Sequence, residues 1–353
     1  AEGFDLIDFG SNDFEFHLCK ASKIISSYFD SYISNYFGDE YEHSKKFIFL
    51  QHGVIHTDIS KWLDYKRNML CFVTSTLAEF HAIAADNSPY QVGYKEVVLT
   101  GLPRHDQLLI NNQQDSKVIL IMPTWRASTM GKVIGSGHTR VVNEYFMDSD
   151  YAQHWYRLLH NEALAKLAKE RDYKIIFAPH ANVEPYINDF NVPSYIDTWR
   201  ASTATTSIQK LFQKARIMIT DYSSVAFEMG LLGKTVIYYQ FDQQEFFSGT
   251  HTTQKGYFDY ENDGFGPIVT EEGALITELE KVLKNNGEPS EPYLTRMRET
   301  FAYRDTNNCK RVYEAIIDLD RPDTSQVPVD IIMEYAQKAI THESWDLVLE
   351  RIE

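Results

Sequence analysis

The sequence predicts an α/β fold built on two parallel sheets. Short apolar runs alternate with segments of helical periodicity, which is typical of βα units around parallel strands. The length of 353 residues exceeds what one core ordinarily holds and favours two domains. A polar segment without apolar periodicity, residues 111–116, separates two series of such runs. We therefore predict domains at residues 1–112 and 113–322 and a helical tail at 323–353.

The expected strands and helices follow from this alternation. Apolar runs bounded by turn residues predict strands at residues 46–50, 69–74, 96–99, 117–122, 173–178, 216–220 and 234–239. Helical periodicity predicts one long helix over 151–171, shorter helices over 77–83 and 225–232, and a terminal helix near 331–340. Ser75 is the expected N-cap of the helix over 77–83. Several polar residues follow strands directly, at the sheet edge where open α/β folds bind ligands.

Composition and charge narrow the classes of partner. Hydrophobic residues make up 43% and charged residues 24%, as in a globular protein. The net charge is −16, with 50 acidic and 34 basic residues, which argues against nucleic acid and against electrostatic docking on an anionic membrane. A polyanionic ligand therefore needs a local site that overcomes the overall field.

Neither a metal nor a disulfide framework is predicted. The three cysteines, Cys19, Cys71 and Cys309, form no CxxC pair, and no HExxH spacing occurs, so no cofactor is expected. No apolar run approaches the ~20 residues that span a bilayer, and the start at Ala1 lacks the regions of a signal peptide. We expect a cytoplasmic location. Because no initiator methionine is present, we also expect either a trimmed sequence or a piece of a longer chain.

The segment Thr220-Asp221-Tyr222-Ser223-Ser224 lies between an apolar strand and a helix. Backbone N–H groups at such a turn are free to bind an anion, and short hydroxyls add further donors, which suits a phosphate. The same residue types are also ordinary helix caps, so a purely structural interpretation stays open.

Two histidines occupy equivalent places after strands. His52 stands between Gln51 and Gly53, where a glycine permits close backbone approach and the imidazole could act as a general base. His180 follows Pro179, which stops its strand, and could donate to phosphate oxygens. Each taken alone could equally be a hydrogen-bonded structural histidine. Facing sheets would bring both to one cleft.

Three further charged residues are weaker candidates. Arg126, in Pro-Thr-Trp-Arg at a strand end, offers a guanidinium for bidentate phosphate contact, or is an exposed loop arginine. Arg104 could face a ligand or only close a domain-edge turn. Glu228 could bind ribose hydroxyls or be a solvated helix residue.

An ordered set of motifs resembles the CDP-glycerol glycerophosphotransferase family of teichoic acid and capsule polymerases. The resemblance covers about residues 45–318. The motifs are Gln51-His52-Gly53, Gly101-Leu102-Pro103-Arg104, Pro123-Thr124-Trp125-Arg126, Pro179-His180, Thr220-Asp221-Tyr222-Ser223-Ser224, Gly264-Phe265-Gly266-Pro267, and Asp305-Thr306-Asn307-Asn308 with Arg311.

This resemblance implies a GT-B architecture, in which two Rossmann-like domains face a cleft. The first domain takes the acceptor and the second holds a CDP-polyol donor. The residue matching His52 is implied to deprotonate the acceptor hydroxyl, and the one matching His180 to act on the donor pyrophosphate. The implied acceptor-side residues are Gln51, Gly53 and Arg104. The implied donor-binding residues are Thr220, Asp221, Ser223, Ser224, Glu228 and Arg126.

The implied reaction is transfer of a polyol phosphate, glycerol phosphate in the first place, from the CDP-activated donor. The acceptor is the terminal hydroxyl of a growing polyol-phosphate or glycan polymer, teichoic acid or capsule, and CMP is released. The resemblance also implies that the protein acts at the inner face of the plasma membrane. It would be held there by peripheral contact with the membrane or by a further domain. Because the segment before His52 is shorter than the family's amino-terminal domain, part of the acceptor side is expected to be missing or rebuilt.

Two other functions fit the same fold. One is a GT-B glycosyltransferase that uses a sugar nucleotide, although Val236 stands eight positions after Glu228, where retaining members carry a second glutamate. The other is a non-catalytic nucleotide- or polymer-binding module of a larger polymerase. The chain has neither a Walker P-loop nor a Gly-x-Gly-x-x-Gly fingerprint, which argues against an ATPase or a dinucleotide oxidoreductase.

Overall fold

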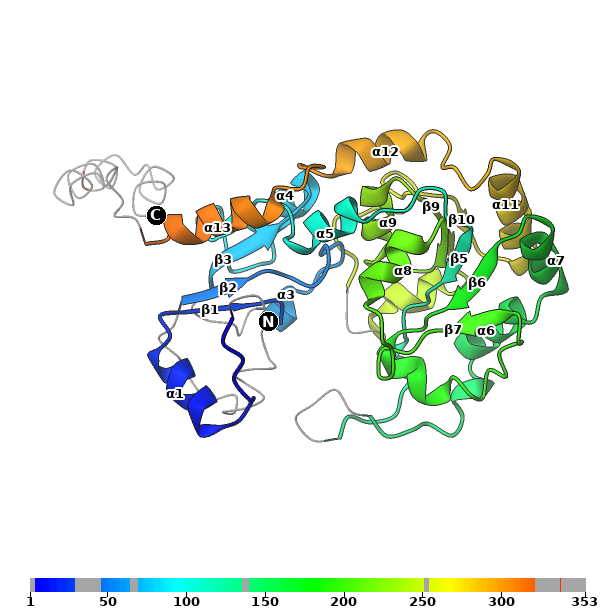
Figure 1. The fold of residues 1–353 in the computed structure, drawn as a ribbon, viewed down its shortest axis with the longest axis horizontal. Helices are drawn as coiled ribbons and strands as arrows, with labels where there is room; N and C mark the ends of the chain where they lie inside the picture. The colour runs from blue at the N-terminus through cyan, green and yellow to red at the C-terminus, as the bar shows by residue number, and fades with distance from the viewer. Residues whose placement is uncertain are drawn as a thin grey trace. The chain divides into compact units, whose positions relative to one another are not determined.

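Two parallel β-sheets with helices packed against them make up the computed structural model (Figure 1). The structure describes residues 4–28, 46–63, 69–134, 140–250 and 254–320, and Gln337. Both sheets belong to one compact unit, Ala1–Ala315, and Ile316–Glu353 form a second unit. The α/β class predicted from the sequence is confirmed. Below, residues 4–110 around the first sheet are called the first half, and residues 117–300 around the second sheet the second half.

The first sheet has the strand order β1-β2-β3-β4, and all of its strand pairs are parallel. Alternate side chains of β2, Phe47 and Phe49, join Phe72 of β3 and Ile83 of α4 in one apolar cluster, as the two-residue period of a strand requires. Its elements are β1 (Lys23–Ser26), β2 (Lys46–Phe49), β3 (Met69–Thr74), β4 (Val97–Leu99), α1 (Asn12–Lys20), α3 (Ser60–Leu63), α4 (Leu77–Ala84) and α5 (Arg104–Ile110).

The second sheet has the order β10-β9-β8-β5-β6-β7, again with parallel pairing throughout. The chain runs outward from β5 through β6 to β7, returns to β8 on the other side of β5, and continues to β10. The strand order therefore reverses between β5 and β8, and their carboxyl ends form the crevice where such sheets bind ligands. The strands are β5 (Val118–Ile121), β6 (Lys174–Phe177), β7 (Ile196–Thr198), β8 (Ile217–Thr220), β9 (Thr235–Tyr239) and β10 (Ile268–Val269).

Helices cover both faces of the second sheet. On β5, Ile119 and Ile121 face one apolar cluster, which contains residues of α6, α7 and α11, whereas Leu120 faces another, which contains residues of α8 and α9. This alternation explains why the strands read as unbroken apolar runs. The helices are α6 (Asp150–Leu159), α7 (Glu162–Glu170), α8 (Ile208–Lys214), α9 (Ala226–Leu232), α10 (Gln243–Glu245), α11 (Glu272–Lys284), α12 (Tyr293–Thr300) and α13 (Asn308–Asp318).

Short 3₁₀ and π-helical turns complete the described structure. They are the 3₁₀ turns η1 (Ala127–Thr129), η2 (Phe146–Asp148) and η3 (Ala181–Tyr186) and the π-helical turn η4 (Phe246–Thr250).

Two predicted helix details are wrong. The single helix expected over 151–171 is two helices, because the Asn161 side chain accepts hydrogen bonds from the N–H groups of Ala163 and Leu164 and starts α7 anew. The N-cap of α4 is Thr76 and not Ser75, since the Thr76 hydroxyl accepts from the N–H of Glu79. In both places a capping side chain overrides the apolar periodicity.

The predicted division of the chain into domains stays a prediction. The boundary at residues 112 and 113 falls between α5 and β5, within the first compact unit. The helix expected near 331–340 and most of the tail at 323–353 lie outside the described residues.

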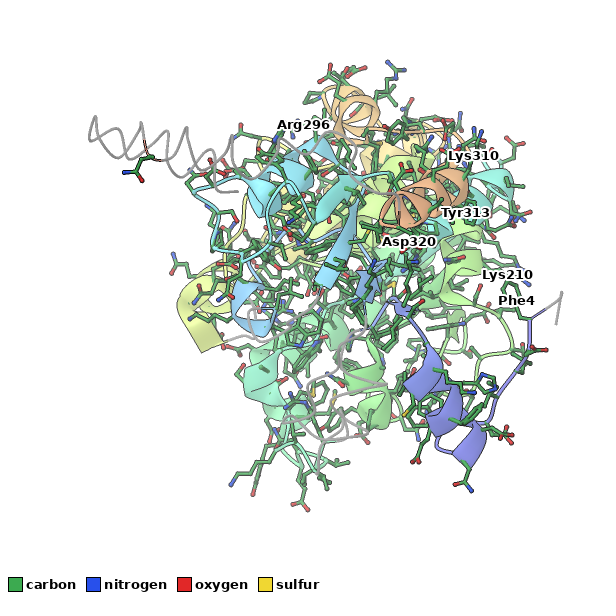
Figure 2. All side chains as sticks on the ribbon, turned by 90° about the vertical axis from the view of Figure 1, so that its left-hand side faces the viewer. Phe4, Lys210, Arg296, Lys310, Tyr313 and Asp320 are labelled. Carbon is green, nitrogen blue, oxygen red and sulfur yellow. The ribbon has the colours of Figure 1, made fainter. Side chains whose placement is uncertain are left out.

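After α12 the chain returns to the first half and is fixed there by Asp106 of α5. Its carboxylate accepts hydrogen bonds from the N–H groups of Asn308 and Cys309, at 2.9 Å each, and from the Asn308 amide at 2.6 Å. Gly101, with φ +77°, leaves room for the Asn308 side chain. From this anchored end α13 continues with its Lys310 and Tyr313 side chains exposed (Figure 2).

Gly101→Ala is expected to destabilise the protein by about 2 kcal/mol or more. A β-carbon there would lie 1.8 Å from Asn308 Oδ1, and the positive φ disfavours any side chain. Gly273→Ala in α11 is the matched control, because nothing lies within 4 Å of its β-carbon position and alanine favours a helix. Denaturant unfolding of both variants tests this, and equal effects would contradict it.

Candidate active site

A cleft of about 260 Å³ lies at the carboxyl ends of β2, β5, β6 and β8. Both halves line it, so the facing of two sheets expected from the sequence is present in the structure. Among the predicted site residues it contains Gln51, His52, Gly53, His180, Ser223 and Ser224. Its lining does not include the other predicted residues, which are Arg104, Arg126, Thr220, Asp221 and Glu228.

Gly53 marks a close approach of the two halves in this cleft. A β-carbon added to Gly53 would lie 3.3 Å from the hydroxyl oxygen of Ser224. Gly53 therefore lets the loop that carries His52 in the first half approach the turn at Ser223 and Ser224 in the second half.

His52 lies at the surface of the cleft with its ring held on one side. Nδ1 is 3.4 Å from the carbonyl oxygen of Ser27, and the ring stacks on Tyr28 with centroids 5.1 Å apart. Because a carbonyl can only accept, Nδ1 carries the hydrogen of the neutral ring and Nε2 is left as a proton acceptor. The pKa of His52 is lowered because protein displaces water around the ring, an effect that Ser27 opposes and Arg104 reinforces.

His180 has the opposite arrangement of protons. Its Nδ1 accepts a hydrogen bond of 3.2 Å from the N–H of Asn182, so the neutral ring carries its hydrogen on Nε2. The ring stacks on Trp125, with centroids 5.9 Å apart. The cleft thus holds one imidazole arranged to accept a proton and one arranged to donate a hydrogen bond.

The turn after β8 offers backbone donors to the cleft. Asp221 lies inside the turn, where its Oδ1 accepts from the N–H groups of Thr124 and Tyr222 at 2.8 and 2.7 Å. Within the described residues, the N–H groups of Ser223, Ser224 and Val225 have no protein acceptor. Successive N–H groups without a protein acceptor, beside the hydroxyls of Ser223 and Ser224, are suited to binding an anion.

Asp221 and Arg126 pair with each other within the protein, and their contact with the donor stays a prediction. Arg126 is 4% exposed and lies between two carboxylates, 2.8 Å from Asp221 and 2.7 Å from Asp242. Burial by itself lowers the pKa of Arg126, but these carboxylates more than offset it and raise the pKa above its usual range. The guanidinium is therefore used to hold the turn and is not directed at the cleft.

Thr220 is also occupied inside the protein. It is fully buried, and its hydroxyl donates to the carbonyl of Met122 at 2.7 Å, which joins the ends of β8 and β5. Together with the Asp221 contact to Thr124, this hydrogen bond fixes the crevice at the reversal of strand order.

Arg104 and Glu228 pair with each other beneath the cleft. Arg104 Nε lies 3.6 Å from Glu228 Oε1, and Arg104 Nη1 donates to the carbonyl of His52. Glu228 is 1% exposed, and burial raises its pKa against the opposing effect of Arg104. This arrangement links the loop that carries His52 to α9, and the ribose contact of Glu228 and the acceptor contact of Arg104 stay predictions.

Glu79, which sequence reasoning missed, anchors the loop that carries His52. It is fully buried on α4 and accepts hydrogen bonds from the N–H groups of Ile55 and Ser75, at 2.7 and 2.8 Å, and from the Gln51 amide at 3.2 Å. Gln51 has φ +60°, a conformation that costs a non-glycine residue energy and that these contacts hold in place. The pattern Thr76-x-x-Glu79 is a capping-box signal that could have identified this residue.

His56 was also missed, and it joins the two halves directly. Its Nε2 lies 3.1 Å from the Tyr222 carbonyl and 3.1 Å from the Tyr260 hydroxyl. Burial lowers the pKa of His56 to about 4, so the ring is neutral near pH 7. No local motif marks it, because its partners are 166 and 204 residues away.

Comparison with known proteins assigns the chain to a family. The family described as CDP-Glycerol:Poly(glycerophosphate) glycerophosphotransferase matches residues 2–318. The chain belongs to this family. The resemblance drawn from the motifs is thereby confirmed for nearly the whole described chain.

Relatives of this family member include two bacterial proteins of teichoic acid synthesis. The minor teichoic acid biosynthesis protein GgaB of Bacillus subtilis (strain 168) is 35% identical over 308 residues, which are 85% of this chain and 33% of that protein. The teichoic acid glycerol-phosphate transferase of Staphylococcus aureus (strain NCTC 8325 / PS 47) is 24% identical over 64% of this chain and 56% of that protein. The chain therefore spans about a third and about half of these relatives.

A solved structure of similar fold is the wall teichoic acid polymerase TagF. Its TM-score is 0.54 at 17% identity, over 78% of this chain and 68% of that one. With the two parallel sheets and the cleft between their strand ends, the architecture is of the GT-B type, as predicted.

Two features are absent from the described part of the chain, a metal-binding cluster and a membrane-spanning helix. There, no group of three or more His, Cys, Asp or Glu side chains could hold a metal ion. No helix among these residues is both long and apolar enough to cross a bilayer.

Glu79→Gln is expected to change how the free energy of unfolding depends on pH. Burial raises the pKa of Glu79 from 4.5 to about 7, so its favourable contribution is full below pH 4.5 and is lost as pH rises towards 7. The slope is about 1.4 kcal/mol per pH unit. Urea unfolding between pH 4.5 and 8 should show the wild type losing stability relative to the variant. Parallel curves would show that the carboxyl does not titrate in this window.

Arg126→Leu is expected to destabilise the fold by about 3–5 kcal/mol, because it leaves the buried charge of Asp221 without its partner. Arg157→Leu, at an exposed position on α6, is the control and should change stability by less than about 0.5 kcal/mol. Thermal or denaturant unfolding measures both. A loss below about 1 kcal/mol for Arg126→Leu would contradict the structural role.

Proposed function

We propose that this chain transfers a polyol phosphate from a CDP-activated donor to the terminal hydroxyl of a phosphate-linked polymer. The observation that carries the proposal is the opposite proton arrangement of His52 and His180 in one cleft. Transfer needs a group that takes the acceptor's proton and groups that stabilise charge on the leaving nucleotide. Family membership supports the same reaction class.

On the acceptor side, His52 serves as the general base. Nε2 of His52 takes the proton of the acceptor's terminal hydroxyl. The oxygen of that hydroxyl attacks the β-phosphorus of the donor. Because the pKa of His52 is lowered, the ring is unprotonated and ready to accept near pH 7. Arg104 and Glu79 act as positioning residues. Arg104 holds the carbonyl of His52, and Glu79 holds the backbone of the same loop at Ile55.

On the donor side, the Ser223 turn and His180 hold the pyrophosphate. The bond between the β-phosphorus and the bridging oxygen breaks, and its electron pair leaves with CMP. The N–H groups of Ser223, Ser224 and Val225 and the Nε2–H of His180 supply neutral donors to this charge. Arg126, Asp221 and Thr220 keep the turn in shape from behind.

CDP-glycerol is the donor we favour, with CDP-ribitol as the nearest variant. The family description names CDP-glycerol, and a TagF variant soaked with CDPG has a similar fold, with a TM-score of 0.53. The proposed acceptor is a polyol-phosphate or glycan chain of a teichoic acid or capsule. The proposed place of action is the cytoplasm at the inner face of the plasma membrane.

The donor class is tested by incubation with CDP-glycerol, CDP-ribitol and UDP-sugars, each with a short phosphopolyol primer. We expect CMP release with lengthening of the primer by one polyol phosphate. Release of UDP without any release of CMP would instead identify a GT-B glycosyltransferase.

His52→Ala is expected to lower kcat by about 10²–10⁴-fold and leave donor affinity unchanged, because it removes the base and no donor contact. His180→Ala should weaken donor binding and lower kcat together. His17→Ala, an exposed histidine on α1, is the control. Steady-state kinetics with titration of a CDP-polyol separates these effects, and full turnover by His52→Ala would exclude the proposed base.

The pH dependence of kcat/KM gives an independent measure of His52. Its lowered pKa places the acidic limb of the profile below pH 6.5, where protonation removes the base. Arg104→Gln removes a neighbouring positive charge and should move this limb to higher pH. An unchanged limb would show that another group titrates.

A further inference from the structure

A second cavity, of about 280 Å³, adjoins the candidate active cleft. Ile55 and Thr57 line both, so the two cavities are separated by little more than these side chains. Its polar lining includes Asp58, His81, Asn87, Ser88, Tyr90 and Lys255.

The wall between the cavities is held on both sides. His56, between Ile55 and Thr57, is buried against Tyr222. Asp58 and Gln254 exchange backbone hydrogen bonds of 3.0 and 3.2 Å, which fix the segment that carries Lys255. The cavity is therefore built from both halves, as the cleft is.

Several polar groups around the cavity are already used within the protein. The Ser88 hydroxyl donates to the Ile83 carbonyl at 2.7 Å, and the Tyr90 hydroxyl accepts from the N–H of Ile59 at 3.1 Å. One oxygen of Asp58 accepts from the N–H of Ser60 at 2.8 Å. These contacts shape the cavity and do not exhaust its polar groups.

Four groups remain for a ligand. The Lys255 ammonium and the Asn87 amide have no hydrogen-bond partner among the described residues, and Asp58 keeps its second oxygen. His81 Nδ1 pairs with the Tyr94 hydroxyl at 3.2 Å, which leaves Nε2. The pKa of Asp259 is lowered mainly by the hydrogen bond from the Asn262 N–H, and Lys255 contributes to the same lowering. One ammonium with a carboxylate, an amide and an imidazole suits a unit that has both hydroxyls and one phosphate.

We propose that this cavity binds the penultimate unit of the acceptor polymer, a hydroxyl-rich polyol or sugar joined by a phosphodiester. The phosphate lies towards Lys255, and the hydroxyls lie towards Asp58 and Asn87. This inference rests on the proposed function, since it makes the terminal hydroxyl in the cleft and the preceding unit in the cavity parts of one chain. With a net charge of −16, the protein needs such a local cation to hold a polyanion.

The kinetic test compares glycerol phosphate primers of one and three units. In the wild type, the acceptor KM should be lower for the trimer than for the monomer. Lys255→Glu should raise the KM for the trimer about tenfold and remove this advantage, with the monomer KM and the donor KM unchanged. Asn87→Leu, which keeps the charge, should have a smaller effect in the same direction.

Lys210→Glu is the matched control, because Lys210 is an exposed lysine of α8 and lines neither cavity (Figure 2). It makes the same change of charge and should leave the trimer KM unchanged. An equal rise for both variants would mean that only the overall field matters, and this would overturn the inference.

Direct binding separates this inference from the proposed reaction. Calorimetry in the absence of donor measures the affinity of the trimer for the wild type and for Lys255→Glu. It therefore gives an answer even if no polyol is transferred. Length-dependent binding that Lys255→Glu abolishes supports the cavity even if no CMP is ever released. Transfer with a trimer KM that Lys255→Glu does not change overturns the cavity and leaves the reaction standing.

Trimers of ribitol phosphate and of a hexose phosphate distinguish a polyol from a sugar ring. The trimer with the largest affinity gain over its own monomer identifies the unit that the cavity holds. If none of the glycerol phosphate, ribitol phosphate and hexose phosphate trimers binds more tightly than its own monomer, the inference is wrong.

Discussion

The hydrogen bond between His56 and the Tyr222 carbonyl, at 3.1 Å, determines how the two halves meet. His56 follows His52 by four residues, and Tyr222 directly precedes Ser223. A contact between these loops therefore sets the distance from the candidate base to the anion-binding turn. Because Gly53 adds no side chain, the two loops can approach this closely. The lowered pKa of His56 keeps its ring neutral, so the junction holds no uncompensated buried charge near pH 7.

The charged side chains near the cleft form ion pairs and hydrogen bonds mainly with other groups of the protein. Arg126 satisfies Asp221 and Asp242, and Arg104 lies between Glu228 and the His52 carbonyl. This division suits the proposed binding of an anionic donor by an acidic protein. Backbone N–H groups attract a pyrophosphate without the cost of burying free cations, and they are already oriented before the ligand arrives. The buried pairs supply that orientation.

Sequence reasoning identified β5, β6, β8 and β9 of the second half and the residues at their carboxyl ends, because fully buried parallel strands read as apolar runs bounded by turn residues. It missed the short strands β7 and β10. It found neither β1, whose Ile25 is exposed at a sheet edge, nor the break at Asn161. It could place Arg126 at a strand end but could not show that Asp242, from another loop, forms an ion pair with its guanidinium. Contacts between distant segments decide whether a charged side chain faces a ligand or the protein, and no local pattern reports them.

The polypeptide passes between the halves twice, at residues 111–116 and again where Ala302 donates to the Ser75 carbonyl at the end of β3. Contacts between distant parts of the chain join the halves as well, through His56 and the Tyr222 carbonyl, through Asp58 and Gln254, and through Gln213 and the Gln107 carbonyl. Widening of the cleft would have to break these links together, so a rotation of one half against the other is opposed at several places along the chain.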